Sequence, residues 1–473
     1  MFKIAVAGTG YVGLVAGACF AHRGHLTVCV DTDEPKVDLL KKGISPIYEQ
    51  GLEELMRENM DAGRLCFTAD YREAYREADA IFIGVGTPEM PDGSADLAHI
   101  AAVARQIAET IEKDCLVVVK STVPVGTNDK VEQFIRDFLP RGGVDAAGGK
   151  IRVEVASNPE FLAQGTAVRD TLEAARIVIG TQSRWAEERL LKIYEPFGLP
   201  VVSVSRRSAE MIKYASNVFL ALKISYMNEI AGLCEKVEAD ILDVALGMGC
   251  DERIGSRFLN AGIGYGGSCF PKDTKALEYL ARQNGCLLRT VKAAIEVNND
   301  QKTLLFKKAC VRMISFKGLK AAVLGLTFKP GTDDLREAPS LVNIPLLLER
   351  GAEVCAYDPA GTENFKKLFA EGCHGKGRIG YAGDFKSALL GANICFILTD
   401  WEEIRAVKPR EFRKLMKNPL VYDGRNLFDP KEMKRAGVEY YSVGRTNPGK
   451  GGALVNDIPP ERKAEKSGIQ KIS

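Results

Sequence analysis

Residues 3–13 read Lys3-Ile-Ala-Val-Ala-Gly-Thr-Gly-Tyr-Val-Gly13, a short β-rich run that leads directly into a GxGxxG turn. Leu14 to Ala21 then has the small and apolar residues of a helix packed on a sheet, and Leu26 to Val30 is a second apolar run that ends at Asp31. A bare GxGxxG motif is weak evidence. Strand, turn, helix, second strand and an acid at its carboxyl end together make a specific signal. The order predicts a doubly wound α/β domain at the amino terminus.

The glycines of this turn suit a bound pyrophosphate. Gly8 permits the tight turn, Gly10 lets a pyrophosphate approach the backbone, and Gly13 brings the helix against the strand. Asp31 is placed to accept hydrogen bonds from an adenosine ribose, and a carboxylate there repels a 2′-phosphate. The pattern favours NAD over NADP, a preference that the nearby Lys36 weakens. The alternative is a doubly wound domain that binds no dinucleotide.

Length and composition limit the classes of function. A chain of 473 residues is expected to form two or three domains. Its 64 basic and 62 acidic residues nearly cancel, so we expect neither nucleic acid nor a membrane as a partner. The 12 cysteines show no metal-ligand spacing and the 4 histidines lie outside every motif, so we expect no metal and no histidine triad. Without a recognisable signal peptide or membrane-spanning run, we expect a cytoplasmic protein.

Further buried strands are predicted at residues 80–85, 115–119 and 151–156. The first two lead into loops that carry Thr87 and Thr122, and the third leads into a loop that carries Glu160. Ligands of open α/β sheets bind at this carboxyl edge. Glu160 is a candidate to hold a water molecule or a ribose, and the alternative is a solvated turn carboxylate.

After a strand near 201–204 the pattern becomes helical. From Ser208 to about Val237, apolar residues recur at the spacing of one buried stripe. Lys213 and Asn217 are four positions apart on another face of this helix and are therefore neighbours. They are either a functional pair or a solvated lysine beside a surface asparagine. We interpret this region as a helical connector between two α/β halves, a common place for a two-fold dimer contact.

A second α/β unit follows, with strands predicted at 319–324, 354–358, 394–398 and 420–423. It lacks a full GxGxxG motif, so a second dinucleotide is not expected, and its basic loop with Lys329 and Arg336 suits a phosphate-bearing ligand. The fold class is therefore α/β, with two Rossmann-like doubly wound domains joined by a long helix. The expected divisions are a cofactor domain at 1–204, a helical dimerisation domain at 205–305, a second Rossmann-like domain at 306–445, and a disordered tail at 446–473.

The segment Gly264-Tyr-Gly-Gly-Ser-Cys-Phe-Pro-Lys-Asp273 places one cysteine in a glycine-rich turn. The glycines allow the backbone to wrap closely around a bound molecule, and Lys272 lowers the cost of a negative charge nearby. Cys269 is therefore a candidate nucleophile. The alternative is a glycine-rich loop whose cysteine is incidental.

Taken in order, these segments resemble the UDP-glucose 6-dehydrogenase family, within the NAD-dependent nucleotide-sugar dehydrogenases. The matching segments are Gly8–Gly13, Gly86–Pro88, Ser121–Pro124, Asn158–Leu162, Glu210–Asn217, Arg253-Ile-Gly, the Cys269 loop and Gly325–Arg336. The resemblance covers nearly the whole chain except its end. It implies oxidation of the primary alcohol of a sugar to a carboxylate, in two hydride transfers that consume two NAD, and it favours a catalytic Cys269.

The resemblance also implies residue roles. Cys269 would trap the intermediate aldehyde as a thiohemiacetal, which is oxidised to a thioester and then hydrolysed. Lys213 would stabilise oxyanions, Asn217 would fix the substrate, and Asp273 with a water molecule would move protons. Glu160 and Thr122 would position the water and the nicotinamide.

The binding residues implied by the resemblance form two groups. The cofactor group is Gly8, Gly10, Tyr11, Val12, Gly13, Asp31, Lys36, Thr87, Thr122, Glu160, Lys272 and Arg336. The substrate group is Glu160, Phe161, Leu162, Lys213, Asn217, Arg253, Tyr265, Gly266, Gly267, Phe328 and Lys329. Arg253 would come from the neighbouring subunit of a homodimer or a higher homo-oligomer.

Two residues depart from the family pattern. Gln164 stands where relatives often carry a charged residue, and Tyr265 stands where phenylalanine is usual. The expected substrate is UDP-glucose, a choice that Phe270 favours. The alternatives are GDP-mannose or a UDP-N-acetylhexosamine with the same chemistry, a single-hydride β-hydroxyacid dehydrogenase, and a non-catalytic nucleotide-binding protein.

Overall fold

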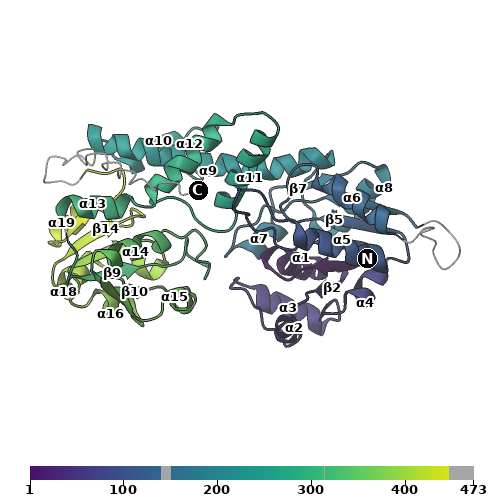
Figure 1. The fold of residues 1–473 in the computed structure, drawn as a ribbon, viewed down its shortest axis with the longest axis horizontal. Coiled ribbons are helices and arrows are strands. Elements are labelled where there is room, and N and C mark those ends of the chain that lie inside the picture. The colour runs from purple at the N-terminus through teal and green to yellow at the C-terminus, as the bar shows by residue number, and fades with distance from the viewer. Residues whose placement is uncertain (140–150, 314, 447–473) are drawn as a thin grey trace, which may run out of the picture.

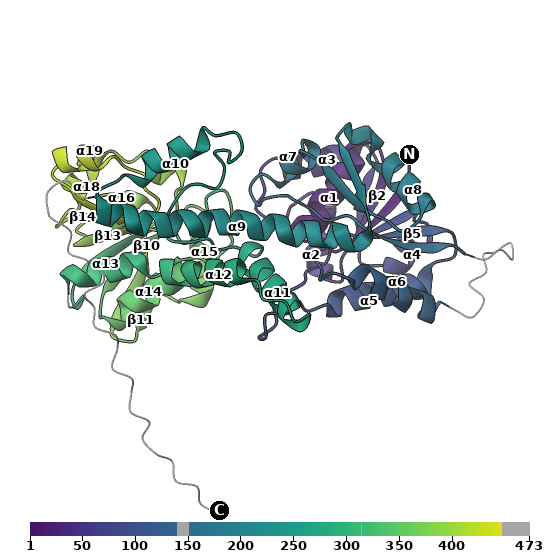
Figure 2. The ribbon, with the colours of Figure 1, turned by 90° about the horizontal axis from the view of Figure 1, so that it is seen from above.

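The computed structural model describes residues 1–139, 151–313 and 315–446. Two α/β lobes lie at opposite ends of an elongated molecule, and one long helix runs from one lobe to the other (Figures 1 and 2). This arrangement confirms the predicted α/β fold with a long connecting helix. Positions 447–473, which make up nearly all of the expected tail, lie outside the described residues.

The first lobe is built on an eight-stranded sheet in the order β3-β2-β1-β4-β5-β6-β7-β8. Its strands are β1 (Lys3–Ala7), β2 (Leu26–Val30), β3 (Leu65–Thr68), β4 (Ala80–Ile83), β5 (Cys115–Val119), β6 (Val153–Ser157), β7 (Ile177–Gly180) and β8 (Val201–Val204). Neighbouring strands are parallel except β6 and β7, which pair antiparallel through Ser157 and Gly180. The strand order reverses between β1 and β4, so the crevice at their carboxyl ends is where a ligand is expected.

Helices cover both faces of this sheet. They are α1 (Tyr11–His22), α2 (Glu34–Lys41), α3 (Leu52–Asp61), α4 (Tyr71–Arg76), α5 (Ala98–Thr110), α6 (Thr127–Phe138), α7 (Ala167–Leu172), α8 (Arg184–Tyr194) and a 3₁₀ turn, η1 (Glu195–Phe197). One core contains buried residues of α1, α2, α3, α7 and α8, and the other contains those of α4, α5 and α6. Strands β1, β4, β5 and β7 are almost wholly apolar because both of their faces are covered, whereas the edge strand β8 is partly exposed.

The connector is α9 (Arg206–Val237), whose 32 residues span about 48 Å at the usual helical rise. It is followed by α10 (Ile241–Gly249), α11 (Phe270–Gln283), α12 (Arg289–Gln301) and α13 (Leu304–Arg312). A small apolar cluster that includes Tyr214, Ala276 and Val291 holds α9, α11 and α12 together. This packing places the start of α11 beside the part of α9 nearest to the first lobe (Figure 2).

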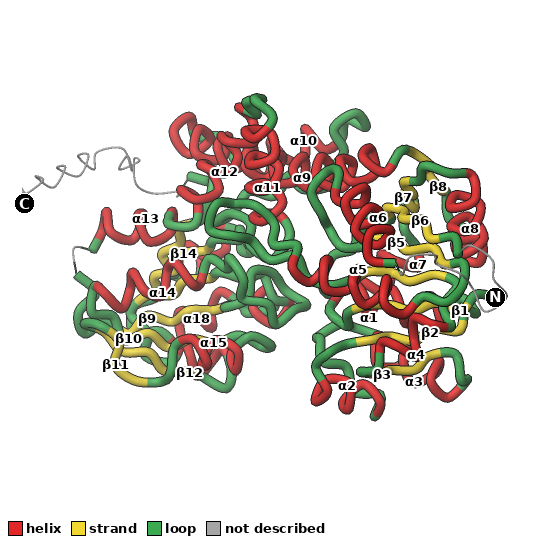
Figure 3. Tube along the Cα trace, turned by 45° about the vertical axis from the view of Figure 1, so that its right-hand side comes forward, coloured by secondary structure: helices red, strands yellow, loops and turns green. Residues whose placement is uncertain are grey.

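The second lobe has a seven-stranded sheet in the order β11-β12-β10-β9-β13-β14-β15. The strands are β9 (Lys320–Leu324), β10 (Glu353–Tyr357), β11 (Gly372–His374), β12 (Gly377–Tyr381), β13 (Ile394–Ile397), β14 (Leu420–Asp423) and β15 (Glu439–Tyr441). The helices are α14 (Ser340–Glu349), α15 (Thr362–Leu368), α16 (Phe385–Leu389), α17 (Glu402–Arg405), α18 (Pro409–Leu415) and α19 (Pro430–Arg435). Long loops, green in Figure 3, gather between the two lobes.

Among the residues that the structure describes, no helix combines the length and the apolar character that a membrane span requires.

Candidate active site

The GxGxxG turn is shaped by the close approach of α1 to the sheet. Gly8 has a φ of +93°, a conformation that glycine adopts without strain. A Cβ on Gly13 would lie 2.0 Å from the carbonyl oxygen of Gly8, and one on Gly84 would lie 2.8 Å from the Cα of Gly13. At Gly10, in contrast, nothing lies within 4 Å of the Cβ position. The turn therefore leaves room above Gly10 for a pyrophosphate.

The start of α1 offers hydrogen-bond donors to that space. Its N-cap is Gly10, which supplies no side-chain hydrogen bond to the first turn. The N–H groups of Tyr11 and Val12 are thus available to a phosphate, and the helix dipole favours negative charge there. The Tyr11 hydroxyl donates to the carbonyl of Tyr48 at 3.1 Å and lies 3.5 Å from Thr332 Oγ1 in the second lobe. The residues present therefore fit a dinucleotide between the lobes.

Asp31 is held in place by donors from three sides. The Thr9 N–H and the Lys36 ammonium donate to Asp31 Oδ2 at 2.9 and 2.7 Å, and the Asp33 N–H donates to Oδ1 at 3.2 Å. Burial by itself would raise the pKa of Asp31, but the hydrogen bonds from Lys36 and Thr9 outweigh it and lower the pKa to about 2. Asp31 is therefore ionised at neutral pH, as recognition of a ribose and repulsion of a 2′-phosphate require.

Replacing this acid should change the choice of cofactor. We expect Asp31→Asn to weaken the binding of NAD and to relieve the repulsion of the NADP phosphate. The binding free energy of NAD should become less favourable by about 1–3 kcal/mol, because a charged hydrogen bond is lost. Titration calorimetry with each cofactor measures both effects. Lys36→Met is the matched control, since it leaves the carboxylate in place and should preserve the preference for NAD. Equal affinities for NAD and NADP in the unmodified protein would contradict this assignment.

Two loops at the carboxyl edge of the sheet are joined through a threonine pair. The Thr87 hydroxyl donates to the carbonyl oxygen of Thr122 at 2.8 Å. Ser121 also donates, to the carbonyl of Val85 at 2.6 Å. The loops after β4 and β5 are thus fixed to each other, with Thr122 half-buried at the edge where the dinucleotide turn lies.

Glu160 and Lys213 form a buried ion pair. Lys213 Nζ lies 2.7 Å from Glu160 Oε1, with side-chain exposures of only 3% and 5%. Glu160 Oε2 also accepts the N–H of Leu162 at 2.8 Å. Burial tends to lower the pKa of Lys213, but the charges of Glu160, Cys269 and Asp273 outweigh it and raise that pKa. Neither residue is a solvated surface group, and Lys213 remains a cation inside the protein.

Asn217, one turn further along α9, contacts Asp273 at the start of α11. Its Nδ2 donates to Asp273 Oδ2 at 2.7 Å, and Lys272 Nζ donates to Asp273 Oδ1 at 2.7 Å. Asp273 is almost fully buried. Each of its oxygens is therefore held by one donor, and the carboxylate has a fixed orientation.

Cys269 is the N-cap residue of α11 and lies next to this group. Burial raises the pKa of its thiol, the charges of Glu160 and Asp273 act in the same direction, and Lys213 opposes them. The cation that favours the thiolate is therefore Lys213, whereas Lys272, to which the sequence assigned that effect, is paired with Asp273. Placement at a helix N-terminus adds a further favourable interaction with the thiolate. Cys269 is half-buried, and the charge of Lys213 favours its thiolate.

The glycines of the Cys269 loop fit against the second lobe. Gly267 has a φ of +84°, and a Cβ there would lie 2.8 Å from the ring of Phe328. The Gly267 N–H donates to the carbonyl of Arg336 at 2.7 Å. A Cβ on Gly266 would lie 2.5 Å from the carbonyl oxygen of Glu337. Glycine is thus required because the Cys269 loop and a loop of the second lobe meet here.

The basic residues of the second lobe lie on the same side as the thiol. Burial lowers the pKa of Lys329. The charges of Glu49 and Cys269 offset part of this decrease. Arg336 forms an ion pair with Asp334 at 2.6 Å. Gln164, a departure from the family pattern, donates to the same carboxylate at 3.1 Å. An acid in place of Gln164 would face Asp334, so glutamine suits this contact between the lobes.

Other predicted contact residues line the ion pair and the thiol loop. The ring of Phe161 lies 5.5 Å from Lys213 Nζ and 4.3 Å from the Arg176 guanidinium carbon. Leu162 packs against the first core. The Tyr265 N–H donates to Asn298 Oδ1 at 2.7 Å. Tyr265 is buried, so it shapes the loop through its backbone and packing.

Arg253 does not join this group within the single chain. Its side chain is 89% exposed and forms an ion pair only with Asp251, at 2.6 Å, among the contacts that the structure describes for it. The other predicted site residues discussed above lie at the carboxyl edge of the first sheet and in α2 beside it, on α9, in the loop that leads into α11 and at its start, or on the loops of the second lobe.

A second buried lysine was missed as a site residue. Lys120 Nζ donates to Asn158 Oδ1 at 2.9 Å, and the hydroxyl of Tyr194 donates to the same oxygen. Lys120 and Glu160 both line a pocket of about 50 Å³. The sequence feature that could have identified Lys120 is its position directly after the five apolar residues of β5.

Lys120 should give the stability of the protein a pH dependence. Burial lowers its pKa from 10.5 to about 8, and Glu160 offsets only part of that effect. Between pH 8 and pH 10.5, Lys120 is protonated in the unfolded chain and deprotonated in the folded chain. Lys120 therefore makes folding more favourable as the pH rises through this range. We expect Lys120→Met to raise the Tm at pH 7, because the lowered pKa of Lys120 costs the folded protein at most about 3 kcal/mol of unfolding free energy there. This gain in Tm should shrink toward pH 10. Thermal unfolding across pH checks this, and a Tm difference that does not vary with pH would contradict it.

Comparison with known proteins agrees with this geometry. Residues 2–198, 207–300 and 322–430 match, respectively, the NAD binding domain, the central domain and the UDP binding domain of the UDP-glucose/GDP-mannose dehydrogenase family. The chain belongs to this family.

Individual relatives match over nearly their full length. UDP-glucose 6-dehydrogenase YwqF of Bacillus subtilis is 47% identical over 443 residues, which cover 94% of this chain and 98% of that protein. The structure of a UDP-glucose dehydrogenase from Pyrobaculum islandicum has a TM-score of 0.85 and 37% identity, covering 94% of this chain and 98% of that one. The UDP-D-ManNAc dehydrogenase of Pyrococcus horikoshii has a TM-score of 0.80 and 25% identity, covering 93% of this chain and 99% of that one.

Proposed function

We propose that this chain oxidises the C6 alcohol of UDP-glucose to the carboxylate of UDP-glucuronate with two NAD as acceptors. The observation that carries the proposal is the placement of Cys269 beside the buried Lys213–Glu160 pair and next to the oriented Asp273. The full-length similarity to UDP-glucose 6-dehydrogenases supports the same activity.

NAD, when bound, accepts one hydride in each of the two oxidations. In the first oxidation, the Lys213 ammonium stabilises the oxyanion that develops on the C6 oxygen. Asn217 fixes the sugar, and Asp273 takes the hydroxyl proton through a water molecule. No histidine is needed, since the orientation of Asp273 is set by Asn217 and Lys272.

Cys269 then holds the aldehyde. Its sulfur attacks the C6 carbonyl carbon, and the carbonyl oxygen takes up a proton to give a thiohemiacetal. Loss of the remaining C6 hydride and the hydroxyl proton converts the thiohemiacetal into a thioester. The enzyme thus completes a four-electron oxidation without releasing an aldehyde.

Hydrolysis of the thioester regenerates the thiol. A water molecule positioned by Glu160 and Thr122 adds to the C6 carbonyl carbon, and Lys213 stabilises the oxyanion of the tetrahedral intermediate. Collapse of this intermediate breaks the carbon–sulfur bond, and Cys269 leaves as a thiolate. The product is the C6 carboxylate.

We also assign regions and contacts to this function. Residues 1–204 hold NAD, with Asp31 on its ribose, and residues 306–445 hold the uridine nucleotide, with Phe328 and Lys329 beside it. The expected cytoplasmic location is checked by cell fractionation.

The main alternative is another nucleotide sugar with the same cysteine chemistry. The structure of a UDP-D-ManNAc dehydrogenase has a similar fold, so the fold alone does not fix the sugar. A steady-state assay with UDP-glucose, GDP-mannose and UDP-N-acetylhexosamines decides between them. We expect kcat/KM to be highest for UDP-glucose, and a preference for another sugar would overturn the substrate assignment while leaving the chemistry in place.

We further propose that two copies of the chain form a dimer along α9. Phe219, Tyr226 and Leu233 are 61%, 50% and 54% exposed on this helix. Large apolar side chains along one exposed helix suit a two-fold contact with a second copy. Arg253, exposed and placed in the loop after α10, would then contact the substrate of the neighbouring subunit.

A mixing experiment tests whether the site is shared. Arg253→Ala should raise KM without unfolding the protein, because among the described residues the exposed Arg253 side chain pairs only with Asp251. Mixing Arg253→Ala with Cys269→Ser should produce hybrid dimers with one intact site, and part of the activity should return. If subunit exchange is demonstrated and no activity returns, Arg253 acts within its own chain.

A further inference from the structure

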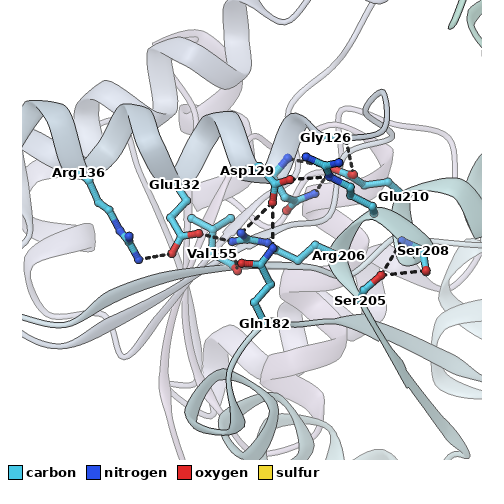
Figure 4. Close-up of polar contacts among 12 residues, drawn as sticks. Gly126, Asp129, Glu132, Arg136, Val155, Gln182, Ser205, Arg206, Ser208 and Glu210 are labelled. Carbon is cyan, nitrogen blue, oxygen red and sulfur yellow. Dashed lines mark hydrogen bonds and ion pairs between the residues drawn. The ribbon is translucent and has the colours of Figure 1, made fainter. Parts of the chain in front are cut away.

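The start of α9 is joined to the start of α6 by a buried carboxylate that the proposed mechanism does not use (Figure 4). Glu210 Oε2 accepts the N–H of Gly126 at 2.6 Å, and Oε1 accepts the N–H of Asn128 at 2.8 Å. The side-chain amide of Asn128 donates to Oε1 as well. Because the first N–H groups of a helix have no partner within the helix, Glu210 satisfies donors that α6 cannot satisfy itself.

The two ends of this contact belong to two parts of the site. Glu210 lies three residues before Lys213 on α9, within one helical turn, and Lys213 forms the ion pair with Glu160. Gly126 lies four residues after Thr122, in the short loop between β5 and α6. Glu210 therefore connects the loop that carries Thr122 to the helix that carries Lys213.

A second contact between the same helices provides a comparison. Arg206 forms ion pairs with Asp129 and Glu132 of α6 and donates to the carbonyl of Val155 (Figure 4). These partners lie within α6 and on β6, further along the chain from the Thr122 loop. Arg206 attaches α9 to the lobe, whereas Glu210 bonds the backbone where the loop enters α6.

We propose that Glu210 is a positioning residue that fixes the Thr122 loop relative to Lys213. The proposal rests on the proposed function, in which Thr122 helps to place the hydrolytic water and Lys213 stabilises the oxyanion formed when that water adds. With Glu210 in place the two groups act on the same carbonyl from a fixed separation. Without it the loop can shift while Lys213 stays paired with Glu160.

Glu210→Gln tests this with almost no change in shape. Gly126 and Asn128 donate to different oxygens of Glu210, and a glutamine keeps an oxygen at only one of these two positions. Its NH₂ group at the other position faces an N–H donor, so one of the two backbone hydrogen bonds is lost. We expect faster amide hydrogen exchange in residues 122–128 and a fall in kcat of about tenfold to a hundredfold, with KM for UDP-glucose changed by less than about threefold. We also expect the acyl-enzyme on Cys269 to accumulate, visible by intact-protein mass spectrometry, because hydrolysis slows more than oxidation.

Glu132→Gln is the matched control, because it removes an ion pair between the same helices without a contact to the Thr122 loop. It should lower the Tm and leave the kinetics and the acyl-enzyme level unchanged. Glu210→Asp, which retracts the carboxylate by one methylene, should give an intermediate effect and serves as the test variant if Glu210→Gln does not fold.

The outcomes separate this proposal from the proposed function. Hydrogen exchange is measured without substrate, so unchanged exchange in residues 122–128 overturns the role of Glu210 whatever the enzyme oxidises. Faster exchange with kinetics equal to those of Glu132→Gln also overturns it, since the contact would then be merely structural. If the unmodified protein does not oxidise UDP-glucose, the proposed function fails, and the exchange result still decides whether Glu210 fixes the loop.

Discussion

Cys269→Ser should lower steady-state turnover of UDP-glucose by about three powers of ten or more, while NAD and the sugar nucleotide still bind. A serine hydroxyl has a far higher pKa than a thiol, so the neighbouring Lys213 and the start of α11 cannot make it an effective nucleophile or leaving group. Steady-state NADH formation measures the loss, and calorimetry checks binding. Cys286→Ser is the matched control, because Cys286 is an exposed cysteine just beyond the other end of α11 and should be silent.

The serine variant should also separate the stages of the reaction. It can still oxidise the alcohol slowly, and an ester formed on the introduced serine would appear by mass spectrometry as an added nucleotide-sugar mass. Two NADH per sugar at a near-normal rate from Cys269→Ser would remove the thiol from the mechanism. Direct oxidation of the hydrated aldehyde would then be the better account.

Lys213→Met should affect both catalysis and stability. Removing a charge that stabilises developing oxyanions costs about 10²–10³ in kcat, on the scale of a lost oxyanion-hole donor. The same change leaves Glu160 buried without its cation, which costs about 3–5 kcal/mol of stability. Stopped-flow NADH formation and thermal unfolding measure the two effects on the same sample.

Adding Glu160→Gln to Lys213→Met separates these two effects. The double variant no longer buries an unpaired charge, so much of the lost stability should return. Activity should not return, because neither the oxyanion-stabilising cation nor the carboxylate that positions water is restored. Recovery of activity together with stability would show that neither charge takes part in the chemistry and that Lys213 acts only on stability.

The parts of the fold that the sequence predicted are those with strong local patterns. Strands β1, β2, β5, β8 and β14 begin and end where their apolar runs do. Burial explains the apolar runs of β1, β5 and β14, whereas β8 lies at the edge of its sheet and is partly exposed. Three short strands of the second sheet were not predicted: β11, β12 and β15. Their residues are largely half-exposed or exposed, so their sequences lack the apolar run that marks a buried strand.

The site was harder to predict than the fold because its partners are distant in sequence. The spacing of Lys213 and Asn217 could not decide between a buried pair and a solvated surface, since that depends on Glu160 and Asp273, which lie 53 and 56 positions away. The same limitation hid the ion pair of Lys272 with Asp273 and the closeness of Lys213 to the thiol. Sequence motifs name the candidate residues, and tertiary packing determines which of them meet.

Counting the NADH formed per UDP-glucose consumed by the unmodified protein tests the central claim most directly. A thioester on Cys269 requires two oxidations before any product leaves, so the account predicts two NADH per sugar and no free aldehyde when an aldehyde-trapping reagent is present. One NADH per sugar would instead indicate a single-hydride dehydrogenase. None would indicate a nucleotide-binding protein, and either result would contradict the proposed mechanism.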